Sequence, residues 1–339
     1  MTRSTPAGLT VLLALSLTAP VLTAPARAAP DPSQLDVLFI GNSYVNQNDL
    51  PKLTKALLTE LHDGEVRVEA LLRTGGKLKQ AERDTSKDSP WRDMLVKEKW
   101  DWVILQEQSQ VPGFGANQDD WDNSLRAIKK LDARIAGTGG NTALLNTWGY
   151  LNGDPRNRAI YPDYPTMQSR LDEGYGVFEV ALTSGVREPR LIPAGPAFER
   201  IYLDLVGDGR DPLDPAGPFH ALYYEDGGHP SPAGSYLAAC VIAASLTGES
   251  PAGTGLGPDM GPVMSSYLQD VAARIVLGTP PQQEAPLTPD PAPPPLSADV
   301  AAGNLEPPAT GGCGGWFGAV LLFLPLAGLR RSAGISRSG

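Results

Sequence analysis

The stretch VLFIGNSYVNQND, from Val37 to Asp49, decides the expected fold. It opens with four apolar residues that run into Gly-Asn-Ser, which is typical of a fully buried parallel strand. Ligands of open α/β sheets bind outside the carboxyl ends of the strands, so Ser43 lies where chemistry is expected. Gly-Asn-Ser is also ordinary turn composition, and this stretch by itself leaves both interpretations open.

Strand-like and helical stretches alternate along the rest of the chain. Apolar residues at helical spacing in LPKLTKALLTELHDG (50–64) precede a strand pattern in VRVEALLR (66–73). The alternation continues with a buried strand in KWDWVILQEQSQ (99–110) and an amphipathic helix in DDWDNSLRAIKKLDARIAG (119–137). This order predicts an α/β fold, in which helices cover both faces of a parallel sheet.

The composition bounds the function. The formal net charge is −10, which argues against nucleic acid and against binding of anionic lipid by charge. The chain has three His, no Cys/His metal pattern and no Gly-rich phosphate loop, so we expect neither a metal nor a cofactor. Cys240 is expected to be a small buried residue.

The two ends of the chain predict export from the cytoplasm. Residues 1–28 have the layout of a secretory signal peptide, with the early Arg3, an apolar stretch and a closing Ala-Arg-Ala pattern. The domain is expected to span residues 29–278. Residues 279–308 are rich in Pro and predict an extended linker.

Residues 309–339 resemble the C-terminal sorting tails of bacterial surface proteins. They contain a Gly/Cys motif, the short apolar stretch Trp316–Leu329 and then Arg330 and Arg331. The resemblance implies a sorting protease as a partner, with Cys313 as the site of processing or lipid attachment. The alternative is a plain membrane anchor. In either case the tail is expected to insert in the membrane, and the domain to be tethered outside the cytoplasm.

A second informative stretch, YYEDGGHPSPAGSYLAA (223–239), lies near the end of the domain. Asp226 and His229 are three residues apart in a Gly-rich loop before a helix. A catalytic Ser needs a base that takes its proton and a carboxylate that orients this base, and the Asp-x-x-His spacing can supply both. Alternatively, the two side chains only cap the backbone of a helix start.

Together, FIGNSY (39–44) and DGGHPSPAG (226–234) resemble the SGNH/GDSL hydrolase superfamily, in a branch whose first block reads Gly-Asn-Ser-Tyr. The resemblance covers roughly residues 36–247. It implies a flavodoxin-like three-layer α/β/α sandwich and an esterase that acts through a Ser-His-Asp triad. Ser43 is then the nucleophile, His229 the base and Asp226 the orienting carboxylate.

The same resemblance implies an oxyanion hole made of the Ser43 N–H, a Gly after the second strand and a side-chain amide after the third. RTGGKL (73–78) offers Gly75 or Gly76, and we favour Gly76 because it directly precedes the helix. The family's Gly-x-Asn-Asp block is replaced by VILQEQSQ. The amide of Gln106 can donate to an oxyanion as an Asn amide does, and Gln108 is the alternative.

The substrate prediction is a short-chain ester, with acetyl groups on an extracellular polysaccharide favoured over a small molecule. No long apolar lid that would shelter a fatty acyl chain is visible in the sequence, and the acidic charge disfavours docking on anionic membranes. A lipase or thioesterase is one alternative, and a non-catalytic glycan-binding surface module is another. Trp148, Gly149 and Phe198 follow later strand-like stretches. They are interpreted either as residues that shape a substrate pocket at the same edge of the sheet or as core and turn residues.

Overall fold

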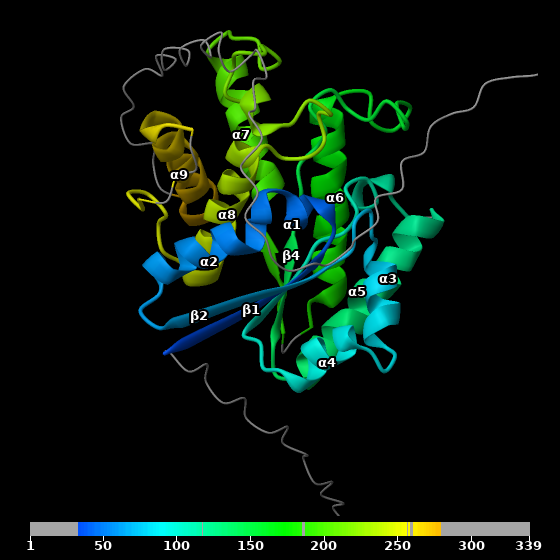
Figure 1. Ribbon diagram of the computed structural model, residues 1–339. Coiled ribbons are helices and arrows are strands. Elements are labelled where there is room, and N and C mark those ends of the chain that lie inside the picture. Colours follow the sequence, from blue (N-terminus) through cyan, green and yellow to red (C-terminus); the bar gives the residue numbers. More distant parts are fainter. Residues whose placement is uncertain (1–32, 117, 185–186, 256, 258–259, 279–339) are drawn as a thin grey trace, which may run out of the picture. The chain divides into compact units, whose positions relative to one another are not determined.

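The structure is a computed structural model that describes residues 33–116, 118–184, 187–255, 257 and 260–278 (Figure 1). The predicted signal peptide (1–28), linker (279–308) and sorting tail (309–339) therefore lie outside the described residues. Within the part of the chain that is described, no helix is long and apolar enough to cross a membrane.

The sheet of this domain has five parallel strands in the order β2-β1-β3-β4-β5. The strands are β1 (Gln34–Gly41), β2 (Glu65–Leu72), β3 (Trp102–Leu105), β4 (Asn141–Leu145) and β5 (Arg190–Ile192). This is the flavodoxin-like order, in which the chain direction across the sheet reverses between β1 and β3. The carboxyl ends of β1 and β3 therefore border the crevice where such folds bind ligands.

The helices follow the strands in the alternating order that the sequence predicts. They are α1 (Ser43–Asn46), α2 (Leu50–Leu61), α3 (Leu78–Thr85), α4 (Pro90–Lys97), α5 (Asp119–Gly137), α6 (Tyr164–Leu182), α7 (Ala194–Gly207), α8 (Pro232–Thr247) and α9 (Pro262–Leu277). Three short 3₁₀ turns complete the described elements: η1 (Gln47–Asp49), η2 (Pro112–Phe114) and η3 (His220–Leu222).

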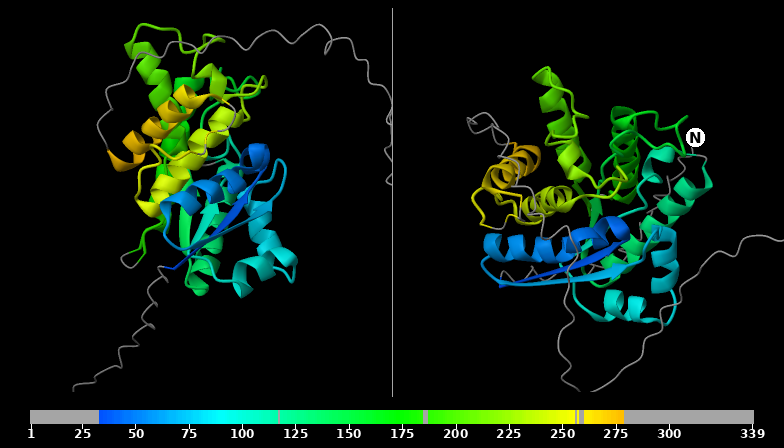
Figure 2. Two further views of the ribbon diagram at one scale, coloured as in Figure 1. Left: turned by 60° about the vertical axis from the view of Figure 1, so that its left-hand side comes forward. Right: turned by 45° about the horizontal axis from the view of Figure 1, so that its top comes forward.

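Two hydrophobic cores lie on opposite faces of the sheet, because successive residues of a strand point to opposite sides. In β1, Val37 and Phe39 pack into the core under α2, α7, α8 and α9. Leu38 and Ile40 pack into the core under α3, α4, α5 and part of α6. Figures 1 and 2 show these helix layers on either side of the strands. The α/β/α sandwich expected from the sequence is thus the observed fold.

The sequence did not predict α4. Ser89 begins this helix, since its hydroxyl accepts a hydrogen bond from the Arg92 N–H at 3.1 Å, and Pro90 occupies the first turn. Of its eight residues only Leu95 is fully buried. A helix of two turns with one core residue has almost no periodic signal, so its position follows from packing rather than from pattern.

Candidate active site

Ser43 is the first residue of α1, directly after β1. The turn between them is held by Asn42, whose side-chain oxygen accepts a hydrogen bond from the Tyr44 N–H at 3.1 Å. The Asn42 carbonyl accepts from the Val45 and Asn46 N–H groups. Short polar side chains of this kind satisfy the free N–H groups of a helix start. As a result, Ser43 sits at the carboxyl edge of the sheet, beside the point where the strand order reverses between β1 and β3.

Asp226 and His229 lie in the loop between η3 and α8. One Asp226 oxygen accepts hydrogen bonds from the backbone N–H groups of Gly228 (3.0 Å) and His229 (2.9 Å), which folds the loop into a tight turn. Gly227 has φ +66°, a left-handed conformation that glycine adopts without strain. The turn leaves the second Asp226 oxygen free to meet the imidazole.

The loop places both side chains in line with Ser43. The second Asp226 oxygen lies 2.5 Å from His229 Nδ1, and His229 Nε2 lies 2.9 Å from the Ser43 hydroxyl. When Nδ1 carries the proton and donates to Asp226, Nε2 is left as the acceptor for the Ser43 hydroxyl. The structure thus brings together the three residues that the sequence singled out, which lie 183 and 186 positions apart along the chain.

The charge on Asp226 is stabilised locally. Burial raises the pKa of this carboxyl, but the hydrogen bonds from the His229 ring and from the N–H groups of Gly228 and His229 outweigh that effect and leave the pKa below its ordinary value. The carboxyl is therefore ionised at neutral pH and can orient the imidazole. The Asp226 side chain is 52% exposed and that of His229 is 36% exposed, so solvent reaches the pair.

The Asp226–His229 loop is anchored from several sides. The indole N–H of Trp148 donates to the Gly228 carbonyl at 3.2 Å, and the Leu151 N–H donates to the Gly227 carbonyl at 2.8 Å. The Asn48 amide, from the segment after Ser43, donates to the Pro230 carbonyl at 2.9 Å. These bonds join the loop to β4's exit and to the nucleophile segment, so the distance from Ser43 to His229 is fixed by tertiary contacts.

The other residues predicted for the oxyanion hole gather around Asn42. The Gly76 carbonyl accepts a hydrogen bond from the Asn42 side-chain amide at 2.9 Å, while the Gly76 N–H donates to the Arg73 carbonyl at 2.8 Å. The Gln106 side-chain oxygen accepts from the Asn42 N–H at 2.9 Å, and its amide nitrogen donates to the Glu107 carbonyl. Both residues thus contact Asn42, and both are hydrogen-bonded within the protein.

Gln108 points elsewhere. Its amide donates to the Gln110 side-chain oxygen and lies 3.4 Å from the Ser109 hydroxyl. The Ser43 N–H has no hydrogen-bond partner among the described residues. Of the two predicted backbone donors, the Ser43 N–H is therefore free, whereas the Gly76 N–H is engaged. The roles of Gly76 and Gln106 remain predictions.

Glu107 is a residue of this edge that sequence reasoning missed. Its carboxylate is fully buried and accepts hydrogen bonds from the Leu78 and Gln108 N–H groups and from the Ser124 hydroxyl. It therefore ties the end of β3 to the first residue of α3 and to α5. No local motif marks it, although a Glu two residues after the end of a buried strand is unusual enough to have been a signal.

Three stacked aromatic rings extend from the residue next to Ser43 into the core. Tyr44, next to Ser43, stacks on Trp148 at 5.0 Å between ring centroids, and Trp148 stacks on Phe198 at 4.5 Å. Trp148 and Phe198 are fully buried. Of the two interpretations of these residues, the core interpretation is therefore correct. Gly149 is buried in the segment after β4, and its carbonyl accepts a hydrogen bond from the Tyr223 hydroxyl at 2.9 Å.

Within the described residues, no group of three or more His, Cys, Asp and Glu side chains is arranged so that it could hold a metal ion. Cys240 is fully buried in α8, and burial raises the pKa of its thiol. The hydrogen bonds that join Asp226, His229 and Ser43 form an arrangement that allows nucleophilic attack by Ser43, with His229 as the proton acceptor.

The sequence matches no protein-family model and no curated protein. The fold, by contrast, resembles several solved structures. A crystal structure of a DUF4886 family protein from Bacteroides uniformis is 19% identical with a TM-score of 0.56, over 72% of this chain and 95% of that chain. At this level of identity the likeness establishes the fold and leaves the activity to be argued from the site.

Two further structures have lower TM-scores. A protein from Slackia heliotrinireducens, provisionally described as an SGNH hydrolase, is 25% identical with a TM-score of 0.46, over 63% of this chain and 99% of that chain. A catalytic mutant of an acetylxylan esterase from Geobacillus stearothermophilus is 14% identical with a TM-score of 0.40, over 63% of this chain and 92% of that chain.

Proposed function

We propose that this chain is a serine esterase that removes short acyl groups, with acetyl groups on carbohydrate as the favoured substrate. The observation that carries the proposal is the chain of hydrogen bonds from Asp226 through His229 to the Ser43 hydroxyl, 2.5 Å and 2.9 Å long. It lies at the carboxyl edge of the sheet, beside the point where the strand order reverses.

The reaction follows from the roles of the three side chains. His229 Nε2 takes the proton of the Ser43 hydroxyl while the oxygen attacks the ester carbonyl, and Asp226 stabilises the imidazolium that forms. The imidazolium then protonates the departing alcohol, which leaves an acyl group on Ser43. A water molecule, deprotonated by His229, attacks this acyl-enzyme and releases the acid and the free serine.

The oxyanion of both steps needs donors near Ser43. The Ser43 N–H is the first, since it has no other partner among the described residues. Gly76 and Gln106 are the proposed second and third donors. The Gly76 N–H must leave the Arg73 carbonyl, whereas the Gln106 amide nitrogen has a second hydrogen besides the one given to the Glu107 carbonyl. Hydrogen bonds of this kind tighten only when the reacting group is bound.

The preference for short acyl groups on a polar substrate rests on the surroundings of Ser43. Polar side chains follow β3 at this edge, and the Ser109 hydroxyl meets the Tyr150 hydroxyl at 2.8 Å. The net charge of −10 opposes docking on anionic membranes, where a lipase would find its substrate. A chain-length series of nitrophenyl esters tests this preference, and a maximum at eight carbons or more would favour a lipase.

The decisive experiment compares the wild-type domain with the Ser43→Ala and Asp226→Asn variants. We expect Ser43→Ala to abolish hydrolysis of p-nitrophenyl acetate and labelling by a fluorophosphonate. Asp226→Asn should lower kcat on the order of 10⁴-fold, because the imidazole then loses the carboxylate that holds it in the right tautomer. Ser86→Ala, at an exposed residue after α3, is the control and should retain activity. Unchanged turnover in Ser43→Ala would refute the triad, and an unlabelled wild type would favour a glycan-binding module.

We also propose that the domain works outside the cytoplasm, tethered to the bacterial cell surface. The support is in the sequence: a signal-peptide layout in residues 1–28, a Pro-rich linker in 279–308 and a sorting-type tail in 309–339. Polymeric carbohydrate is available in that location, which fits the proposed substrate.

A further inference from the structure

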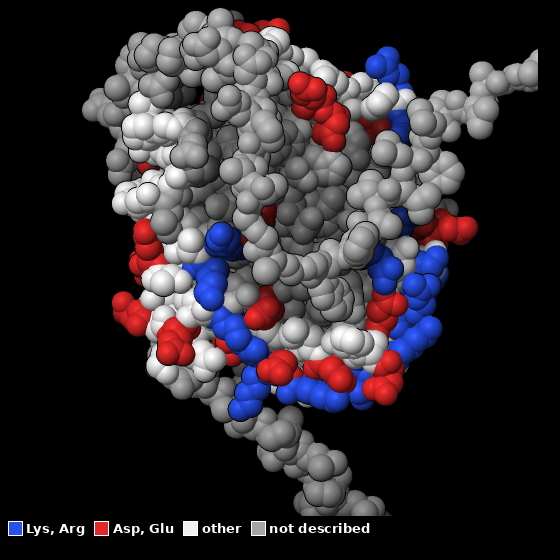
Figure 3. All heavy atoms as spheres, in the orientation of Figure 1, with Lys and Arg blue, Asp and Glu red and all other residues white. Residues whose placement is uncertain are grey.

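A groove lined by basic side chains lies between α3 and α5. It encloses about 490 Å³, a size typical of ligand sites. Five cations and two carboxylates line it, which leaves an excess of three positive charges in a chain whose net charge is −10. The cations are Lys77, Lys79, Arg83, Arg126 and Lys130, and the carboxylates are Glu82 and Asp120. Figure 3 shows Lys and Arg side chains gathered on this side of the domain.

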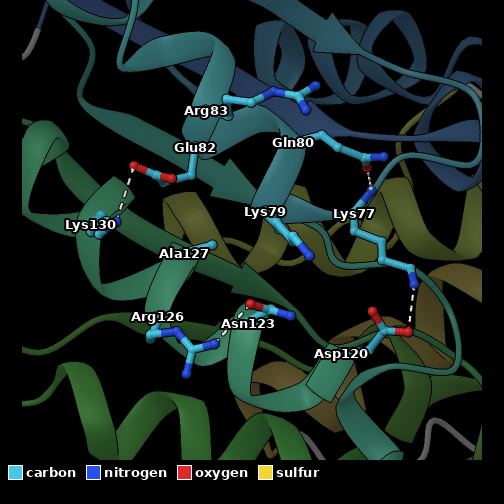
Figure 4. A pocket seen from close by; sticks show the side chains of 10 residues that line it. All are labelled: Lys77, Lys79, Gln80, Glu82, Arg83, Asp120, Asn123, Arg126, Ala127 and Lys130. Carbon is cyan, nitrogen blue, oxygen red and sulfur yellow. Dashed lines mark hydrogen bonds and ion pairs between the residues drawn. The ribbon is translucent and has the colours of Figure 1, made fainter. Parts of the chain in front are cut away.

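The positive excess is not neutralised inside the groove. Lys79 and Arg126 form no ion pair with any described residue, and Arg126 only donates a hydrogen bond to Asn123 at 2.8 Å. Figure 4 shows the Lys79 side chain reaching from α3 toward α5. Like charges on facing helices repel each other, so this arrangement destabilises the empty groove and favours an anion in it.

The remaining cations share their partners. Lys130 is 3.8 Å from Glu82, which also pairs with Arg134 at 2.7 Å, outside the groove. Arg83 is 3.5 Å from Asp84, which also pairs with Arg73. Glu82 and Asp84 can each neutralise one cation only, so one positive charge remains beside each of these carboxylates. Only Lys77 has a groove partner of its own, Asp120, at 2.6 Å.

The groove begins at the catalytic edge of the domain. Lys77 directly follows Gly76, whose carbonyl binds the side chain of Asn42, and Asn42 directly precedes Ser43. Two peptide bonds and one hydrogen bond therefore connect the first groove residue with the nucleophile. α3 follows β2 and α5 follows β3 along the chain, so both helices start on the side of the sheet where the strands end. The groove between these helices therefore runs away from the catalytic edge.

We propose that the groove between α3 and α5 binds a polysaccharide that carries carboxylate groups, so that an acetylated sugar of the same chain reaches Ser43. This deepens the proposed esterase function and rests on it. A linear polymer can extend from the catalytic edge into a groove between two helices, and uronate carboxylates are matched by the unpaired Lys79 and Arg126. The negative charge of the rest of the chain opposes a nucleic acid or an anionic bilayer, whose charged surface would extend well beyond the groove.

The test uses a double variant, Lys79→Glu with Arg126→Glu, in the otherwise unchanged chain. The matched control is Lys52→Glu with Lys55→Glu, which makes the same change of charge at two exposed residues of α2. Acetylated polygalacturonate is the anionic substrate, acetylated xylan the neutral polymer and p-nitrophenyl acetate the small substrate. We expect the groove variant to lower kcat/KM about tenfold on acetylated polygalacturonate alone, mainly through KM, and added salt to diminish the difference.

Binding is measured separately in the Ser43→Ala background, with unacetylated polygalacturonate as the probe. This arm needs no turnover, so a failed esterase proposal and a failed groove proposal give different results. Equal binding by the groove variant and the control would overturn the proposal. Equally tight, groove-dependent binding of duplex DNA or of phosphatidylglycerol vesicles would also overturn it, because the groove would then be a general polyanion site. A second variant, Lys79→Gln with Arg126→Gln, covers the case that charge reversal prevents folding.

Discussion

Replacing Glu107 with Gln should change the pH dependence of stability in a direction that the structure fixes. The Glu107 carboxylate is fully buried, and burial raises its pKa. The hydrogen bonds from Ser124 and from the Gln108 and Leu78 N–H groups, together with the positive charge of Lys77, oppose this rise without cancelling it. The folded protein therefore holds the Glu107 proton more tightly than the unfolded chain does.

The sign of the effect follows from this difference in proton binding. Between the ordinary pKa of a Glu and the raised value, the folded state carries the proton and the unfolded state does not. The free energy of unfolding then decreases as the pH rises, by about 1.4 kcal/mol per pH unit from this group. Glu107→Gln removes the titration, so its free energy of unfolding relative to wild type should increase with pH above about 4.5.

Urea unfolding followed by tryptophan fluorescence, at a series of pH values from 4.5 to 8, measures this difference. Glu60→Gln, at an exposed residue of α2, is the matched control and should show no such trend. The Glu107→Ala variant tests how much the hydrogen bonds of this carboxylate contribute to the free energy of unfolding. It leaves the buried N–H groups of Leu78 and Gln108 unpaired, at about 1–3 kcal/mol each, so it should destabilise the domain by about 2–6 kcal/mol. A Glu107→Gln difference that stays constant or declines with pH would refute the reasoning.

Two further predictions concern packing and the chain ends. In α6, a Cβ on Gly174 would lie 1.9 Å from the Pro112 carbonyl oxygen, so Gly174→Ala should destabilise by about 1–3 kcal/mol. Gly176 has nothing within 4 Å of such a Cβ, and Gly176→Ala should stabilise by about 0.5–1 kcal/mol in the same urea experiment. If residues 309–339 are a sorting signal, mass spectrometry of the protein from cells should find the apolar tail removed. A membrane-bound form that still ends at Gly339 would show a plain anchor.

Local pattern was sufficient for the framework of the domain. The helix expected over residues 119–137 is α5 with the same ends, because three acidic residues begin it and a regular apolar stripe runs through it. The alternation of strands and helices predicted a parallel sheet that is covered by helices on both faces. The helix α4 was missed because its single fully buried residue, Leu95, gives no period to detect.

At the site, the residues that could be predicted are those that lie in a local motif. Ser43 begins the helix that follows a buried strand, and Asp226 and His229 share one turn, so each is marked by its immediate neighbours. Asn48 is not marked in this way, because its partner Pro230 lies 182 positions away. Glu107 is satisfied by α3 and α5, from 29 residues before it and 17 residues after it. Such contacts depend on which elements the fold places side by side.

Two residues that differ from the SGNH/GDSL motifs, which the sequence resembles, compensate for each other. The first block has Asn42 where Gly-Asp-Ser-Leu has an acid, and the Asn42 amide donates a hydrogen bond to the Gly76 carbonyl. An Asp carboxylate in that position would face a carbonyl oxygen without a proton to donate. The third block has Gln106 in place of an Asn, and its longer side chain reaches the Asn42 N–H at 2.9 Å. Asn42 is 3% exposed and Gln106 is 1% exposed, so an unpaired polar group on either side chain would destabilise the folded protein. Asn42, Gly76 and Gln106 therefore form one buried hydrogen-bond network next to Ser43.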